Sequence, residues 1–397
     1  MVAIEESTAA AAAGVSFSLT EEQKELCRLA HAFAEREIRP REAAHDAEQR
    51  HPAELIAHAH ELGLMNLQVP AEYGGLGLSA FDGMLVGEEI NWGCTGIGTS
   101  ILANGLGSAP VILFGSPEQR AHWLPPLAEQ PILCSFALTE PGAGSDVAAL
   151  RSTAVRDGDA YVLNGSKTFI TNAGHARWSV VFAKTDAAGG RRGISAFIVP
   201  MDLPGVTIEK HLEKMGQRAT DTSAFALHDV RVPAENRLGE EGDGFKIAMA
   251  TLDFTRPGTA IGAVGVAQAA YEHALEYSKQ RVTFDVPIAM HQAVGFMVAD
   301  MATGIQAARL LCWQAAWMLD NGMGREATLH SSFAKRFAAD TAMKVTTDAV
   351  QVLGGYGYIK EYPVEKLMRD AKLFQIYEGT SQIQRLVIAR EIYTPKS

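Results

Sequence analysis

Apolar and polar residues follow one another with helical spacing in the first third of the chain. Thr20 with Gln23 forms a capping box in front of an amphipathic run that reaches Ile38. Further start and stop signals for helices stand at Pro52, Gly63, Ser116, Pro117 and Gln119. The pattern therefore predicts an N-terminal α-helical domain over residues 18–132.

The pattern changes from residue 133 onward to short runs rich in β-branched and aromatic residues. Asp157-Gly158-Asp159 separates two such runs, and Asn164-Gly165 is a second turn signal of the kind found in hairpins. Val180–Ala183 and Ile194–Val199 are further β-rich runs. We expect a middle domain built as an antiparallel barrel or sandwich over residues 133–243, closed by a glycine-rich boundary.

Helical spacing returns after Phe245 in long segments. The breaks expected between them are Pro257, Pro287, Gly322–Gly324, Gly354–Gly357 and Pro363. Four or five helices with short breaks favour a C-terminal bundle over residues 244–397. The predicted fold class is thus α+β, with an N-terminal helical domain, a central antiparallel β domain and a C-terminal four-helix bundle.

Composition narrows the classes of function. The net charge of −11 argues against a nucleic-acid-binding role. The most apolar run, Ile261–Ala270, is too short to span a bilayer, so no membrane insertion is expected. Residues 1–17, with Glu5, Glu6 and an alanine run, fit no targeting peptide and are expected to be disordered. The four cysteines are widely spaced and no H-E-x-x-H occurs, so no metal site is expected.

The sequence has none of the common nucleotide or hydrolase motifs, G-x-G-x-x-G, the P-loop or G-x-S-x-G. It has instead polar, glycine-containing stretches where loops are expected. In T-E-P-G-A-G-S-D, residues 139–146, glycines would let a ligand approach the backbone and Thr139 and Ser145 offer hydroxyls. Phe169 and Thr171 share one face of a strand and could line a planar ring. An ordinary turn explains the first stretch equally well, and a core residue beside a strand edge is the more common explanation of the second.

Two more stretches allow similar alternatives. Arg281, Thr283 and Phe284 suit a phosphate and an adenine, but a surface helix end would look the same. Glu378 stands before Gly379 and an expected N-cap, Thr380 or Ser381, where its charge could simply favour the dipole of the last helix.

The order of the stretches T-E-P-G-A-G-S-D, F-I-T-N, M-G-Q-R-A-T-D-T, L-G-G-Y-G-Y and R-D-A-K-L-F-Q-I-Y-E-G-T-S-Q-I-Q-R is more informative than any one of them. From residue 19 to 392 the chain resembles the acyl-CoA dehydrogenase family, particularly its medium-chain members. The resemblance implies FAD between the β domain and the bundle, with the adenosine end reaching a neighbouring subunit. It also implies a homotetramer built as a dimer of dimers, an acyl-CoA substrate and an electron-transfer flavoprotein as acceptor.

The resemblance also assigns residues to roles. The expected FAD contacts are Phe136, Thr139, Ser145, Phe169, Thr171, Arg281, Thr283, Phe284, Gln292, Gln351, Gly355, Thr380 and Gln382, those from Arg281 to Gly355 acting from the partner subunit. The expected substrate contacts are Ser145, Asp253, Arg256 and Gly379. The chain departs from the family pattern at Asp285, where glycine is usual, and at Met290, where an acidic residue is common.

Glu378 is the expected catalytic base. An α-proton of a thioester is weakly acidic, so burial beside flavin and the acyl chain must raise the pKa of the base, and the enolate must be stabilised. In the family the thioester oxygen is held by the backbone N–H of the catalytic glutamate and a ribityl hydroxyl, and the β-hydrogen leaves as hydride to flavin N5. Some relatives carry the base at the position of Thr255, where threonine cannot serve.

The substrate is expected to be a medium-length fatty acyl-CoA. Residues 93–99 resemble the wall of the medium-chain pocket, and Gly98 is expected to deepen it. No arginine lies between Ile90 and Asn104 to receive a second carboxylate. A branched, aromatic or pathway-specific thioester remains the alternative, and a catalytically silent FAD-binding scaffold is the alternative from another class. The expected location is the bacterial cytoplasm, or alternatively the mitochondrial matrix.

Overall fold

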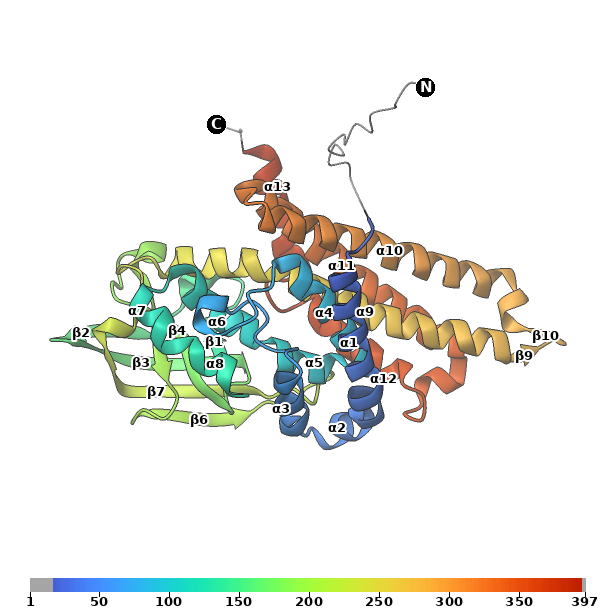
Figure 1. Ribbon diagram of the computed structural model, residues 1–397, viewed down its shortest axis with the longest axis horizontal. Coiled ribbons are helices and arrows are strands. Elements are labelled where there is room, and N and C mark those ends of the chain that lie inside the picture. Colours follow the sequence, from blue (N-terminus) through green and yellow to red (C-terminus); the bar gives the residue numbers. More distant parts are fainter. Residues whose placement is uncertain (1–16, 395–397) are drawn as a thin grey trace, which may run out of the picture.

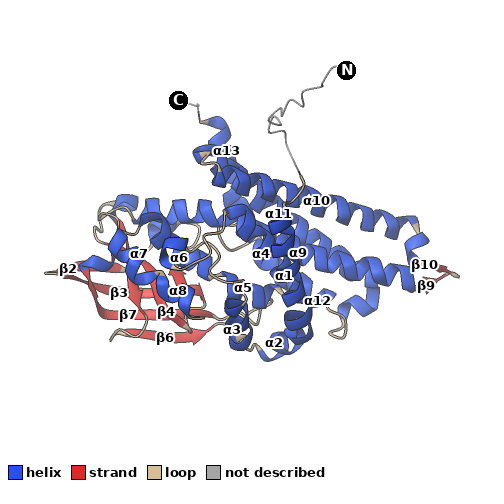
Figure 2. Ribbon diagram, viewed as in Figure 1, coloured by secondary structure: helices blue, strands red, loops and turns tan. Residues whose placement is uncertain are grey.

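The computed structural model describes residues 17–394, and it shows the predicted succession of helical, β and helical parts (Figures 1 and 2). The first sixteen residues of the segment expected to be disordered lie outside the described residues. The helices of the N-terminal part are α1 (Glu21–Phe33), α2 (Glu42–Glu48), α3 (Ala53–Glu61), α4 (Ala80–Gly93), α5 (Thr95–Leu102), α6 (Asn104–Phe114), α7 (Pro117–Trp123) and α8 (Pro125–Glu129). Both predicted capping boxes form, Thr20 with Gln23 at α1 and Ser116 with Gln119 at α7.

The middle part is one eight-stranded, mostly antiparallel sheet in the order β6-β7-β3-β2-β4-β5-β8, with β1 paired in parallel to β4. Its strands are β1 (Leu133–Ala137), β2 (Thr153–Asp157), β3 (Ala160–Thr171), β4 (Ala176–Lys184), β5 (Ile194–Pro200), β6 (Val206–His211), β7 (Thr222–Pro233) and β8 (Arg237–Leu238). The turn at Gly158 joins β2 to β3, as predicted. Asn164-Gly165 is not a hairpin turn but lies inside β3, where the register with β7 shifts.

The C-terminal part consists of long helices and a small hairpin. Its elements are α9 (Gly244–Gln280), β9 (Val282–Thr283), β10 (Val286–Pro287), α10 (Gln292–Asp320), α11 (Gly324–Leu353), α12 (Val364–Phe374) and α13 (Ser381–Tyr393). The predicted break at Pro257 is wrong, because α9 continues through this buried proline. A proline inside a helix costs about 3 kcal/mol, which the packing of α9 in the core of the bundle outweighs.

The longest apolar helical stretch is Thr95–Phe114, formed by α5 and α6, and not the run expected near Ile261. By length and composition alone it could cross a membrane. More than half of its 18-residue window is buried inside the protein. Ile97 and Ile101 belong to the same core cluster as Ile261 of α9, so this stretch serves as a core segment joining the N-terminal part to the bundle.

The helix α9 runs along the long axis of the molecule and connects all three parts (Figure 1). Its first turns carry Ile247 and Ala248, which pack against the apolar face of the sheet around Trp178. Its middle packs against α4 and α11, and its end leads into the β9–β10 hairpin at the far tip of the bundle (Figure 1). One helix therefore fixes the distance between the β domain and that tip.

Candidate active site

Glu378 lies in the tight connection between α12 and α13. Its φ is 49° and that of Gly379 is 86°, so both residues adopt the left-handed conformation. This conformation is costly for a residue with a side chain and persists only where the surroundings enforce it. Of the two expected N-caps, Thr380 and Ser381, Thr380 caps α13. Its hydroxyl accepts a hydrogen bond of 3.1 Å from the N–H of Ile383.

The carboxyl group of Glu378 points to α9. The hydroxyl of Thr255 donates to its Oε2 over 3.0 Å, and Thr259, one turn along the same helix, also hydrogen-bonds to it. Burial raises the pKa of Glu378, while these hydroxyls and the cations Lys335 and Arg256 oppose the rise. The structure thus provides a carboxyl group with a raised pKa. Thr255 cannot act as a base, but it donates a hydrogen bond to this carboxyl group.

Asp253 and Arg256, the expected CoA contacts, form an ion pair with each other on α9. Arg256 is buried, and the second carboxylate oxygen of Asp253 accepts from the hydroxyl of Thr328 over 2.9 Å. The positive charge of Arg256 therefore lies inside the bundle, where it opposes the rise in the pKa of Glu378. A contact of either residue with CoA stays a prediction.

A polar network that the sequence did not reveal supports the Glu378 loop from below. Asp370 of α12, fully buried, accepts from the backbone N–H of Gln217 and from Lys366 over 2.8 Å. The amide of Gln217 accepts from Thr99 of α5 over 3.0 Å, and Gln217 and Thr99 both hydrogen-bond Tyr377, next to Glu378. Residues from all three parts of the chain therefore hold the loop.

The five predicted flavin contacts lie on β1, β3 and the loop after β1. Phe136 is in β1, Thr139 and Ser145 are in the loop, and Phe169 and Thr171 end β3. Phe169 has a φ of 57° and its side chain is 67% exposed. The register with β7 shifts between Lys167 and Ile170, which turns Phe169 outward. An exposed aromatic ring on a strained backbone is typical of a surface that packs on a ligand.

The loop after β1 is held by an ion pair that the sequence did not predict. Lys167, fully buried, donates to Glu140 over 2.7 Å and to the carbonyl of Phe182 over 2.6 Å. Glu140 also accepts the backbone N–H groups of Arg151 and Ser152. The acidic residue of the T-E-P-G stretch therefore shapes the loop, while Gly142 and Gly144 border open space into which a Cβ would fit freely.

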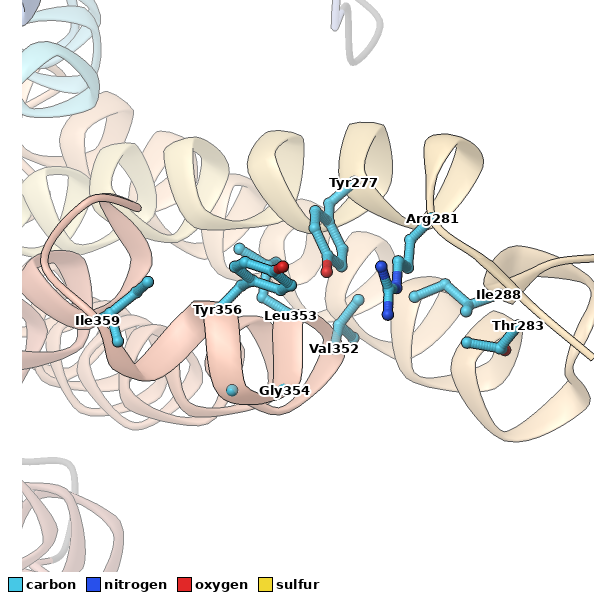
Figure 3. Close-up of a pocket in the computed structure, with 10 residues that line it drawn as sticks. Tyr277, Arg281, Thr283, Ile288, Val352, Leu353, Gly354, Tyr356 and Ile359 are labelled. Atoms are coloured by element: carbon cyan, nitrogen blue, oxygen red, sulfur yellow. The ribbon is translucent and has the colours of Figure 1, made fainter.

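Three of the remaining predicted contacts line a pocket of about 470 Å³ at the tip of the bundle (Figure 3). Its walls include Arg281 and Thr283, together with Gly355 and the rings of Tyr277 and Tyr356. Arg281 lies 5.9 Å from the ring of Tyr356 and makes no ion pair among the described residues. Figure 3 shows its guanidinium pointing into the space beside Tyr277. A free arginine near aromatic rings suits a phosphate and a planar base.

Three predicted contacts stand apart from the walls of this pocket. Phe284 is 90% exposed in the β9–β10 turn, and the exposed Gln292 and Gln351 are not among the lining residues. Phe284 and Asp285 both have positive φ, the geometry of a type I′ turn. Glycine is favoured at such a position and aspartate tolerates it, which explains how Asp285 replaces the usual glycine.

Thr380 and Gln382 border a second pocket of about 380 Å³ between α11 and the start of α13. Asp340, Lys372 and Arg385 also line it. Asp340 accepts from Ser381 over 2.9 Å and from Arg385 over 2.8 Å, so its charge is compensated. The backbone start of α13 and its basic residues make this a suitable place for an anion.

The comparisons with known proteins agree with this arrangement. Family models described as the N-terminal, middle and C-terminal domains of acyl-CoA dehydrogenase match residues 20–131, 135–230 and 242–393. The chain belongs to the acyl-CoA dehydrogenase family. It is therefore a flavin-dependent oxidoreductase, and its cofactor is FAD.

Individual acyl-CoA dehydrogenases resemble the chain over nearly its whole length. An acyl-CoA dehydrogenase of Bacillus subtilis is 45% identical over 94% of this chain and 98% of its own. A probable medium-chain specific acyl-CoA dehydrogenase 2 of Caenorhabditis briggsae is 43% identical over 95% and 91%. The solved butyryl-CoA dehydrogenase of Megasphaera elsdenii is 42% identical over 96% and 100%, with a TM-score of 0.93. The relatives thus differ in the acyl length that their names state.

The residues present fit FAD on grounds independent of the family. Gly142, Gly144 and Gly355 border open space without a positive φ, so nothing inside the chain requires their lack of a side chain, whereas Gly354 is needed for the φ of 61° at the end of α11. Phe169 is exposed, and Thr139 and Thr171 are half-buried. A long polar cofactor with a planar ring system at one end matches these features.

Gly98 does not face open space. A Cβ at this position would come within 3.1 Å of Ile90 and 3.2 Å of Asn91, both on α4. Asn91 is buried and also lies against Gly262 of α9. The expectation that Gly98 deepens an acyl pocket is therefore wrong for this packing, because the side chain of Asn91 occupies the neighbouring volume.

Proposed function

We propose that this acyl-CoA dehydrogenase oxidises a medium-length fatty acyl-CoA to the trans-2-enoyl-CoA, with Glu378 as the base that removes the α-proton. The observation that carries the proposal is the Glu378 carboxyl group, held on a strained Glu-Gly pair and buried so that its pKa is raised. A base is most effective when its pKa lies near the working pH. FAD, when bound, accepts the β-hydrogen and the electron pair.

The chain's own groups supply positioning and charge. The N–H of Glu378 is free to donate to a thioester oxygen, because none of the described residues accepts from it. Thr255 and Thr259 orient the carboxylate of Glu378. A bound acyl chain would cover the loop beside Tyr377 and exclude water from it. The loop of residues 139–146 with the exposed Ser145 lies on the side of the β domain and would hold the flavin and the thioester arm.

The two groups of FAD-binding residues are too far apart to hold one molecule from a single chain. Thr255, in contact with Glu378, and Arg281 are both on or directly after α9. A helical rise of about 1.5 Å per residue places them roughly 40 Å apart. We therefore propose that Arg281, Thr283 and Gly355 bind the adenosine half of FAD held by a second copy. The homotetramer, typical of the family, would be a dimer of such dimers.

The further partners follow from the chemistry. Reduced flavin must pass its electrons on, and we propose an electron-transfer flavoprotein as the acceptor. The exposed Phe169 marks the side from which such a partner could approach. The relative in Bacillus subtilis supports a bacterial cytoplasmic enzyme.

Anaerobic titration with acyl-CoAs from C4 to C16, followed by bleaching of the flavin, tests the substrate class. Each buried methylene adds about 0.8 kcal/mol, so affinity should rise about fourfold per carbon until the pocket is full. We expect the rise to end at a medium chain length. A plateau at C4, or bleaching only by branched or aromatic thioesters, would contradict the proposal.

Asn91→Ala should move the plateau to longer chains, because it removes the side chain that fills the volume between Gly98 and Gly262. The measurement is the same series of dissociation constants. Asn321→Ala, at the exposed end of α10, is the matched control and should leave the plateau in place. An unchanged plateau in both variants would show that Asn91 does not limit the acyl length.

Arg281→Ala should weaken FAD retention by about ten- to a hundredfold, since a hydrogen bond to a charged group contributes roughly 1.5 to 3 kcal/mol. Because the phosphate would belong to FAD of the partner subunit, the oligomer should weaken as well. Flavin absorbance per chain and mass by light scattering measure the two effects. Full FAD content with unchanged mass would contradict the shared site.

A further inference from the structure

A buried lysine of the bundle contacts the loop that carries Glu378. Lys335 of α11 is only 1% exposed. Its Nζ donates to the carbonyl of Phe374, the last residue of α12, over 2.6 Å and to the carbonyl of Gly379 over 2.7 Å. These two carbonyls stand on either side of Glu378 in the chain. One ammonium group therefore ties both ends of the loop that carries the base.

Tyr377 is also held by Gln217 and Thr99, whereas the backbone carbonyls of the Glu378–Gly379 pair have one further side-chain donor among the described residues. The amide of Gln384 donates to the carbonyls of Glu378 and Gly379 over 3.1 and 3.2 Å, but Gln384 belongs to α13, which the loop itself begins. Lys335 comes from a different helix and fixes the loop against the body of the bundle. The left-handed pair Glu378 and Gly379 is thus held in place by a group that also carries a positive charge.

We propose that Lys335 is a positioning residue for the base: it holds Glu378 in its strained conformation and keeps its carboxylate ionised enough to act. The inference rests on the proposed role of Glu378. Burying a lysine costs several kcal/mol unless the charge is compensated, so its place here calls for a compensating partner. Two carbonyl oxygens and the nearby Glu378 carboxylate are such partners.

The charges around Glu378 come from three elements. Arg256 is contributed by α9, Lys335 and Asp340 by α11, and the phenol of Tyr377 by the loop. Arg256 is already neutralised by Asp253, whereas Lys335 has no carboxylate within ion-pair distance among the described residues. Burial lowers the pKa of Lys335 to about 8, with the charge of Glu378 opposing the change. At neutral pH the ammonium is therefore present, and it opposes the rise in the pKa of Glu378.

The sign of the expected effect follows directly. Loss of the positive charge raises the pKa of Glu378, so the ionised base becomes scarcer at neutral pH. Below its pKa, the rate of flavin reduction falls about tenfold for each pH unit by which that pKa is raised. Raising the pH should therefore restore the rate in a variant that lacks the charge. If the variant had only displaced the loop, the rate would stay low at high pH.

The experiment is anaerobic stopped-flow reduction of the bound flavin by octanoyl-CoA, measured from pH 5.5 to 9.5. Lys335→Met removes the charge and both donors, and Lys335→Gln removes the charge but keeps an amide donor. Lys344→Met, an exposed lysine on the same helix paired with Asp348, is the matched control. FAD content and thermal stability are recorded for every variant.

We expect both Lys335 variants to shift the profile to higher pH and the control to match the wild type. Lys335→Gln should retain more FAD and stability than Lys335→Met. An unshifted profile in either folded Lys335 variant would overturn the proposal.

Glu378→Gln in the same assay separates this inference from the proposed function. If Glu378→Gln still reduces flavin rapidly, the assignment of the base is wrong. If Glu378→Gln is inactive while the Lys335 variants keep the wild-type profile, Glu378 is the base and the role of Lys335 is wrong.

Discussion

Glu378→Gln should retain the fold and FAD and lose flavin reduction by roughly two to four orders of magnitude, the usual contribution of a positioned general base. The glutamine keeps the size of the side chain and can still accept from Thr255, so the loop should not move. Its amide cannot take a proton at neutral pH. The rate constant for reduction by a saturating acyl-CoA, measured anaerobically, checks the loss.

The rate of flavin reduction by the wild-type protein should also depend on the ionisation of Glu378. Only the ionised carboxylate accepts a proton, and burial raises its pKa. The rate should therefore fall as the pH is lowered through this raised pKa, at a higher pH than an exposed glutamate would require. A near wild-type rate in Glu378→Gln would show that Glu378 is not the base. Absence of flavin reduction in the wild type itself would favour the alternative of a catalytically silent FAD-binding scaffold.

Lys366→Met should destabilise the protein by about 3 to 5 kcal/mol, the usual effect of removing one partner from a buried ion pair. Lys366 donates to Asp370 over 2.8 Å, lies 3.1 Å from Glu42 of α2 and contacts the sulfur of Cys94 over 3.2 Å. Its loss leaves the fully buried Asp370 without its cation. Urea unfolding followed by circular dichroism gives the free energy of unfolding.

The double variant Lys366→Met with Asp370→Leu is the control for that prediction. Replacing both members of a buried pair by apolar groups often restores much of the stability. Here the recovery should be partial, because Asp370 also accepts the backbone N–H of Gln217 from the middle part. A loss below 1 kcal/mol in the single variant would show that Lys366 does not hold the N-terminal part to the bundle.

The sequence predicted the order and type of the three parts because their signals are local. Capping boxes at Thr20 and Ser116 and the turn at Gly158 depend on neighbours a few residues away, and all three form. Pro257 and Asn164-Gly165 were misread for the opposite reason. Packing across the molecule kept α9 continuous through the proline and made the second turn signal a register shift inside β3.

The site shows the same limit. Motifs pointed to Glu378, Phe169 and Arg281. In the structure burial raises the pKa of Glu378, Phe169 is exposed and Arg281 lines a pocket, and their roles stay predictions. Lys335 lies in none of the quoted motifs, and Gln217 lies in M-G-Q-R-A-T-D-T without its role being visible there, because the contacts of both residues join parts far apart in the sequence. One signal was present for Lys335: it stands among Ser331, Ala334 and Ala338 on the apolar face of α11, where a lysine is unusual.

The length of α9 has a consequence for how the protein behaves on dilution. The two binding regions of one chain lie about 40 Å apart along this helix. If each cofactor is therefore held by two copies, cofactor binding and association share one free energy. Free FAD then favours assembly, and assembly lengthens the residence of FAD, by the same factor. The flavin bound per chain then becomes a function of protein concentration, so that a dilute preparation releases FAD without any loss of fold.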